Sequence, residues 1–179
     1  MGAPRPGRVL VSEGEIAARV AELGRAIARD YARANPVLVG VLHGAAPFVA
    51  DLLRGLSIDL TVDFVRASSY GSGTSSSGTV RLVADLTVDI ADRDVLLVDD
   101  VVDTGLTLAA LKRTLEARRP RSVRTCVLLD KTGRRETEVT IDYVGFTIPN
   151  VFVVGYGMDW NGRYRNLPYV AALDDSGGR

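Results

Sequence analysis

Apolar residues recur every three or four positions near the start of the chain. The stripe follows Ser12-Glu13-Gly14-Glu15, whose order matches a capping box, and it stops before Asn35-Pro36. Its members are Ile16, Val20, Leu23, Ile27 and Tyr31. This spacing predicts an amphipathic helix that buries one face.

Shorter apolar runs separated by turn residues predict strands. They cover residues 37–42, 60–65, 80–83, 95–98, 123–129, 143–146 and 151–156. Helical patterns lie between some of these runs, one ending near Leu53 and one ending near Arg118, just before Arg119-Pro120. Because strands alternate with helices, we expect an α/β fold with an open, mostly parallel twisted sheet and helices on both faces.

A segment rich in glycine and serine, at about 67–79, interrupts this alternation. Such a composition does not order itself, so the segment is either an interdomain linker or a mobile lid. A linker would leave an N-terminal fragment with too few strands for a core of its own. We therefore predict one domain over residues 1–179 with a lid at about 67–79.

The most informative segment follows the predicted strand at 95–98. The acids Asp99, Asp100 and Asp103 come next, and then Thr104-Gly105-Leu106-Thr107 at the start of a helical pattern. Ligands of open α/β sheets bind at the carboxyl ends of strands, and the unpaired amides of a helix N-terminus favour a phosphate. Two adjacent carboxylates suit the vicinal hydroxyls of ribose. The pattern therefore predicts a sugar-phosphate site.

Two alternatives exist for this segment. One is an acidic turn between a strand and a helix, which is common for a single Asp but not for this whole ordered pattern. The other is a nucleoside-triphosphatase strand that ends in a magnesium-binding Asp. The chain has no G-x-x-x-x-G-K-[ST] sequence to hold a triphosphate, which argues against the second alternative.

Composition limits the partners of the protein. The 22 basic and 22 acidic residues cancel, so no global positive field recruits nucleic acid or an anionic membrane. We find neither an apolar run of membrane-spanning length nor a signal-peptide pattern, and we expect a cytoplasmic protein that binds small molecules. Cys126, the only cysteine, is predicted to be a buried free thiol, which excludes internal disulfides and cysteine-cluster metal sites.

Basic residues are almost all arginine. Only Lys112 and Lys131 are lysines. Lys131 follows the predicted strand at 123–129 and would lie at the same edge of the sheet as Asp99. It is either a solvated loop residue or a lysine with a chemical role.

The segment from 95 to 108 resembles the phosphoribosyl-diphosphate (PRPP) motif of the type I phosphoribosyltransferases. Further segments, between about 37 and 173, occur in the order found in hypoxanthine-guanine phosphoribosyltransferases. They are Val41-Leu42-His43-Gly44-Ala45, Ser69-Tyr70, Asp130-Lys131, Asp142-Tyr143-Val144-Gly145-Phe146, Ile148-Pro149 and 152–159 (FVVGYGMD). The resemblance implies a small C-terminal hood on the sheet and a purine-binding part at about 130–173.

This resemblance implies a purine-salvage enzyme that converts hypoxanthine or guanine and PRPP to IMP or GMP and pyrophosphate. Asp103 would be the general base at purine N7. Asp99 and Asp100 would hold the ribose hydroxyls, and together with Asp159 they would lie near the cofactor Mg²⁺. The family also implies a homodimer or homotetramer.

The resemblance assigns the remaining contacts as well. Thr104, Gly105, Leu106 and Thr107 would cradle the 5′-phosphate; His43, Gly44 and Arg165 would bind the pyrophosphate group of PRPP; Lys131, Phe152 and Val153, with Asp159 nearby, would bind the purine; Ser69 and Tyr70 would belong to the lid. His43 replaces the Lys or Arg usual in the family. We expect it to donate to pyrophosphate, so that PRPP affinity rises toward lower pH.

Two other functions remain open from the sequence. One is a relative that uses xanthine or another base, because xanthine shares the 6-oxo group and differs at C2. The other is a catalytically silent sensor of PRPP or nucleotides on the same scaffold. Asp103 argues against the sensor, because binding alone needs no general base.

Overall fold

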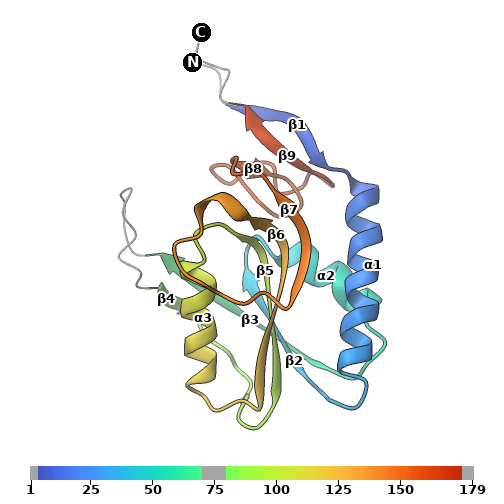
Figure 1. The fold of residues 1–179 in the computed structure, drawn as a ribbon, viewed down its shortest axis with the longest axis vertical. Helices are drawn as coiled ribbons and strands as arrows, with labels where there is room; N and C mark the ends of the chain where they lie inside the picture. The colour runs from blue at the N-terminus through green and yellow to red at the C-terminus, as the bar shows by residue number, and fades with distance from the viewer. Residues whose placement is uncertain (1–3, 70–79, 175–179) are drawn as a thin grey trace.

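The computed structural model describes residues 4–69 and 80–174. A large sheet with helices on its faces carries a smaller sheet at one end (Figure 1). The elements are β1 (Arg5–Val11), α1 (Glu13–Asp30), β2 (Val37–Leu42), α2 (Ala46–Gly55), β3 (Thr61–Ser69), β4 (Val80–Ala84), β5 (Asp94–Val102), α3 (Leu106–Glu116), β6 (Ser122–Lys131), the 3₁₀ turn η1 (Thr132–Arg134), β7 (Tyr143–Ile148), β8 (Val153–Val154) and β9 (Val170–Asp174).

The large sheet has the strand order β4-β3-β2-β5-β6-β7. Only β3 and β4 pair antiparallel, so the mostly parallel sheet expected from the sequence is confirmed. Because β2, β5 and β6 run in the same direction, their carboxyl ends meet at one edge of the sheet. This edge receives the residues that follow Leu42, Val102 and Lys131.

Helices cover both faces of this sheet, as expected. Leu96 and Val98 pack with the apolar residues of α1 and α2, whereas Val95 and Leu97 pack with those of α3. Successive side chains of a strand point to opposite faces, which explains this alternation. All four are at most 1% exposed, and burying one such side chain contributes about 1.5–3 kcal/mol. Cys126 is also buried and free, as predicted.

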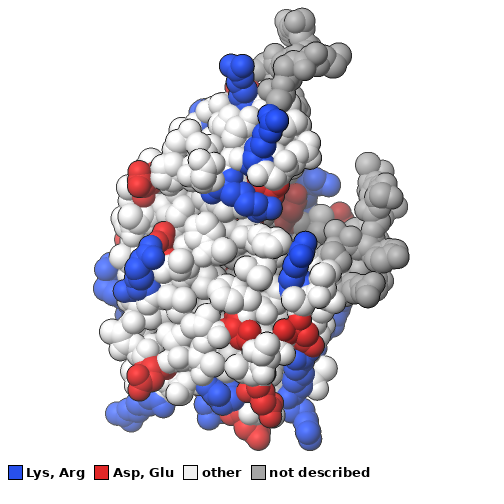
Figure 2. All heavy atoms as spheres, turned by 180° about the vertical axis from the view of Figure 1, so that it is seen from behind, with Lys and Arg blue, Asp and Glu red and all other residues white. Residues whose placement is uncertain are grey.

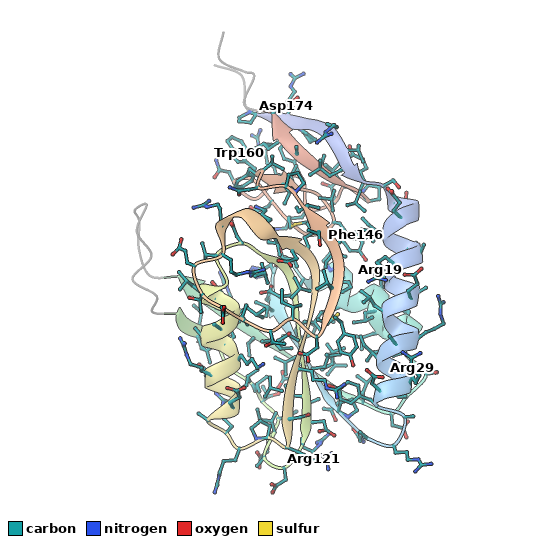
Figure 3. All side chains as sticks on the ribbon, viewed as in Figure 1. Arg19, Arg29, Arg121, Phe146, Trp160 and Asp174 are labelled. Atoms are coloured by element: carbon teal, nitrogen blue, oxygen red, sulfur yellow. The ribbon has the colours of Figure 1, made fainter. Side chains whose placement is uncertain are left out.

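Helix α1 begins as the sequence predicts. The Ser12 side chain accepts from the Glu15 amide at 3.3 Å, and the Glu15 carboxylate accepts from the Ser12 amide at 2.8 Å. Further along the helix, Arg19 donates to the carbonyls of Val144 and Gly145 on β7, at 2.7 and 3.0 Å. Figure 3 shows Arg19 on the side of α1 that faces β7. The helix is therefore fixed to the edge strand by polar contacts as well as by its apolar stripe.

The smaller sheet, of order β1-β9-β8, forms a hood together with residues 155–169. The expected C-terminal hood therefore includes an N-terminal strand that the sequence analysis did not predict. In β1 only Val11 is buried, so this strand has no periodic apolar pattern. The strand predicted at 151–156 is reduced to Val153–Val154, because Gly155 has a φ of +98° and turns the chain.

Two other predicted boundaries differ from the structure. Strand β5 continues past residue 98, because its ladder with β6 pairs Asp99 with Val127 and Val102 with Asp130. The two adjacent acids thus lie within the strand rather than after it. Strand β3 extends to Ser69, so the first residues of the predicted lid belong to this strand. Tyr70 and the rest of the lid, to residue 79, lie outside the described residues.

Candidate active site

The carboxyl edge of β5 carries two buried acids. Asp99 is only 5% exposed, and its carboxylate accepts the amide of Asp100 at 3.0 Å. Burial raises the pKa of both carboxyl groups above the ordinary value, and the charge of Asp100 raises the pKa of Asp99 further. Burial deprives the two carboxylates of the water that would stabilise their charge. Hydroxyl donors or a cation can take the place of that water, so the pair suits ligands of these kinds.

The segment Thr104–Thr107, which we call the phosphate loop, lies at the N-terminus of α3. Gly105 precedes the helix with a φ of +86°, and a Cβ atom there would come 2.7 Å from the carbonyl oxygen of Thr137. Both observations require glycine at this position. The loop borders a cavity of about 110 Å³. Its lining residues are Asp99, Val101, Val102, Asp103, Thr104, Gly105, Thr107 and Leu108.

A second cavity, of about 270 Å³, lies between the sheet edge and the hood. It is lined by Gly44, Asp100, Val101, Lys131, Phe152, Val153, Met158, Asp159 and Arg165. Val101 borders both cavities, so the two spaces are adjacent. Phe152 is 55% exposed, which excludes the core role usual for a phenylalanine in an apolar run. A third hollow of about 580 Å³, lined by residues 32–35 and 56–59, contains none of the predicted site residues.

Two cations lie on one side of Asp103. Its Oδ2 atom is 3.7 Å from Lys131 Nζ and 3.7 Å from Arg134 Nη1. Its Oδ1 atom is buried and has no hydrogen-bond partner in residues 4–69 and 80–174. Lys131 is 7% exposed, so it is not a solvated loop lysine. Because Oδ1 is buried while the side chain as a whole is 33% exposed, a ligand would reach this carboxylate at Oδ2, beside the two cations.

Arg165 and Asp159 form an ion pair within the hood. The guanidinium of Arg165 lies 2.5 Å from Asp159 Oδ1 and donates to the carbonyl of Gly157, also at 2.5 Å. The other oxygen of Asp159 accepts the amide of Gly162 at 2.6 Å. Arg165 lines the cavity, whereas Arg163 is exposed.

The loop after β2 joins the sheet edge to the hood. A Cβ atom on Gly44 would overlap the carboxylate of Asp100, and a Cβ atom on Gly157 would overlap the carbonyl of Gly44. Glycine at both positions therefore lets three segments approach closely. The peptide between Leu42 and His43 is cis. His43 itself is exposed.

Most of the predicted site residues thus surround two adjacent cavities. His43 and Leu106 line neither of them. Arg134, which lies in the turn η1 three residues after Lys131, was not predicted as a site residue. Nor was Met158, whose apolar side chain gives no signal apart from the motif around it.

Carboxylates at this edge do not form a complete metal cage. Within the described ranges, no three His, Cys, Asp or Glu side chains are grouped so that they could hold a metal ion.

The described part of the chain includes no helix with the length and apolarity needed to cross a membrane. Acidic and basic side chains are interspersed on the face that Figure 2 shows.

The family of the chain is shown by its similarity to known proteins. A family model described as "Phosphoribosyl transferase domain" matches residues 10–161. The chain belongs to the phosphoribosyl transferase family. This match includes the phosphate loop, the two adjacent acids and Lys131, and so it confirms the resemblance inferred from those motifs.

Individual relatives agree with this family. The hypoxanthine-guanine phosphoribosyltransferase of Mycobacterium avium is 52% identical over 172 residues, which cover 93% of this chain and 85% of the relative. A Staphylococcus aureus hypoxanthine phosphoribosyltransferase structure superposes with a TM-score of 0.92 at 40% identity, covering 96% of this chain and 93% of that one. The bifunctional protein TilS/HprT of Listeria monocytogenes is 48% identical over 166 residues, but the match spans 93% of this chain and only 26% of that protein.

Proposed function

We propose that this phosphoribosyl transferase moves the phosphoribosyl group of PRPP to hypoxanthine or guanine, giving IMP or GMP and pyrophosphate. The observation that carries the proposal is the adjacency of the two cavities, with Asp103 and Lys131 between the phosphate loop and the hood. The names of the Mycobacterium avium and Staphylococcus aureus proteins support the same reaction. We also propose that the protein acts in the cytoplasm as a homodimer or homotetramer.

PRPP fits the polar part of this site. The 5′-phosphate takes the cavity at the phosphate loop, where the amides and the dipole of α3 favour an anion. Asp99 and Asp100 accept from the two ribose hydroxyls. Arg165 and the Gly44 loop then face the pyrophosphate group, because both line the cavity on the hood side of Asp100.

A 6-oxopurine fits the space under the hood. Lys131 donates to the exocyclic oxygen, an acceptor that adenine lacks at this position. The exposed ring of Phe152 offers a stacking surface, and the backbone of Val153 offers groups to the edge of the base. The site thus selects the base through one charged donor and one aromatic face.

Asp103 acts on the proton that the purine must lose. As the lone pair of purine N9 forms the bond to C1′, the bond from C1′ to pyrophosphate breaks and its electron pair leaves with pyrophosphate. The N7 proton passes to the Asp103 carboxylate, whose accessible oxygen is Oδ2 because Oδ1 is buried. The neighbouring Lys131 and Arg134 hold Oδ2 and keep the carboxylate in place.

Magnesium suits the oxygen donors at this edge. Asp99 and Asp100, and Asp159 through water, would hold the ion together with oxygens of PRPP, since Mg²⁺ is usually bound by one or two carboxylates plus substrate oxygens. When bound, it neutralises charge on the pyrophosphate leaving group. The incomplete protein cage described above agrees with a metal that arrives with its substrate.

The test is nucleotide formation from PRPP and magnesium with hypoxanthine, guanine, xanthine, adenine or uracil, each supplied separately. We expect turnover of hypoxanthine and guanine, and at least about 100-fold lower kcat/KM with adenine, because Lys131 then faces an amino group. Turnover of xanthine or uracil alone would identify a relative with another base. PRPP binding without turnover of any base would favour the sensor.

A further inference from the structure

A second layer of residues lies behind the phosphate loop. The amides of Glu136 and Thr137 both donate to the carbonyl of Thr104, at 2.9 and 3.2 Å. The chain that leaves β6 therefore fixes the first residue of the loop through its backbone. Phosphate binding at this loop depends on the orientation of its backbone amides. Residues that fix the loop from behind therefore affect phosphate affinity without contacting the phosphate.

Arg135 is the charged member of this layer. Its Cδ and Nη1 atoms lie 3.1 and 3.4 Å from the point that a Cβ atom on Gly105 would occupy, so the side chain packs directly against the loop backbone. Its other terminal nitrogen forms an ion pair with Asp130 on β6. Asp130 is paired with Val102 in the sheet, next to Asp103. The guanidinium thus connects the sheet edge to the start of α3.

One part of this guanidinium lacks a partner. Nη1 is buried and makes no hydrogen bond to any residue in 4–69 or 80–174. It lies beside the positive end of α3, and within residues 4–69 and 80–174 the guanidinium has Asp130 as its one anionic partner, at the other terminal nitrogen. A phosphate dianion at the loop is attracted both by the helix end and by this guanidinium. Arg135 is not among the residues that line the phosphate cavity, so its effect would reach the ligand through the loop.

We infer that Arg135, held by Asp130, is a positioning residue for the phosphate loop. It strengthens the binding of the 5′-phosphate and has little effect on the binding of the purine or of pyrophosphate. This inference rests on the proposed function, because it takes the ligand of the loop to be the phosphate of PRPP or of the nucleotide product. It assigns roles to two side chains, neither of which lines the two cavities.

Arg135→Gln is the direct test. We expect KM for PRPP to rise about tenfold and the calorimetric Kd for IMP to rise by a similar factor, since one charge-assisted contact corresponds to about that change. KM for hypoxanthine and Kd for pyrophosphate should change less than about twofold, because neither ligand carries a 5′-phosphate. Arg135→Lys keeps the charge and should recover part of the loss.

Asp130→Asn provides a second variant that leaves Arg135 in the chain. It should shift the same two constants in the same direction, and it carries the test if Arg135→Gln does not fold in a thermal unfolding experiment. The matched control is Arg121→Gln, which breaks an Arg–Asp ion pair with Asp94. Figure 3 shows Arg121 at the end of the molecule opposite to Trp160 and Asp174, which lie in the hood. We expect no change in either KM for this control.

Equal rises in KM for PRPP and hypoxanthine, or no rise in either, would overturn the inference. Failure of the proposed function gives a different result, since the unmodified protein would then form no nucleotide. In that case the calorimetric Kd for ribose 5-phosphate tests Arg135 by itself. An unchanged Kd in Arg135→Gln would then contradict the positioning role.

Discussion

Asp103 has two carboxylate oxygens in different surroundings, one beside two cations and one without a partner in the described residues. An amide in its place cannot accept the purine proton. For Asp103→Asn we expect kcat to fall by about 10²–10⁴-fold, with KM for PRPP changed less than about threefold. Steady-state kinetics checks this, with the exposed Glu138→Gln as control. A variant with unchanged kcat would show that Asp103 is not the base.

Asp99 is buried with a raised pKa, which has a consequence for stability. The folded state favours the protonated form, so the stabilisation from that form is complete at low pH and is lost as the pH rises through the raised pKa. Above the ordinary pKa of an aspartic acid, the folded protein must either keep this carboxyl group protonated or bury its charge, and both cost stability relative to the unfolded chain. Asp99→Asn should therefore stabilise the ligand-free protein by about 1–3 kcal/mol at pH 8 and by less at pH 5. Thermal unfolding of Asp99→Asn at both pH values, with Glu138→Gln as the control, measures this change in stability. A loss of stability at pH 8 would contradict this assignment.

His43 is exposed in the loop that leads to Gly44. A protonated imidazole attracts pyrophosphate more strongly than a neutral one, so a contact from His43 to the diphosphate would strengthen toward lower pH. We expect KM for PRPP to be about three- to tenfold lower at pH 6 than at pH 8 in the unmodified protein. His43→Lys should remove most of this dependence. Identical pH profiles for the two proteins would show that His43 does not contact the diphosphate.

At the scale of elements, substitutions in strand β1 test whether the hood supports the purine site. Val11 is 3% exposed, whereas Val9 on the same strand is 48% exposed. Val11→Ala should destabilise the protein by about 1–3 kcal/mol, and Val9→Ala by less than about 0.5 kcal/mol. Because β9 connects β1 to β8, and the Leu173 amide donates to the Phe152 carbonyl at 2.8 Å, KM for hypoxanthine should rise more than KM for PRPP in Val11→Ala. Urea unfolding measures the stability changes of the two variants, and steady-state kinetics measures their KM values. Equal effects of the two substitutions would contradict a supporting role for β1.

The elements that the sequence predicts well are those with a periodic apolar pattern. Helix α1 and strand β2 have such patterns because they bury one or both faces. Strands β1 and β9 lie at the hood, where fewer side chains are buried, and so their residues carry little periodicity. The extension of β5 through Asp99 depends on its ladder with β6, a long-range pairing that no local pattern contains.

At the scale of the whole molecule, motif order predicted the family and most of the cavity residues. Spacing could not predict the ion pairs of Asp103 with Arg134 or of Arg135 with Asp130, because both depend on how the chain turns after β6. It also could not predict that Asp159 pairs with Arg165 inside the hood. These contacts arise where the sheet edge and the hood meet, which is also where the two cavities join.

A crystal structure with IMP and pyrophosphate tests the central claim most directly. We expect the 5′-phosphate on the amides of the phosphate loop, the ribose hydroxyls at Asp99 and Asp100, and the base between Lys131 and Phe152. Asp103 should lie within hydrogen-bond distance of purine N7. A nucleotide bound elsewhere, or an Asp103 carboxylate turned away from the base, would contradict the account.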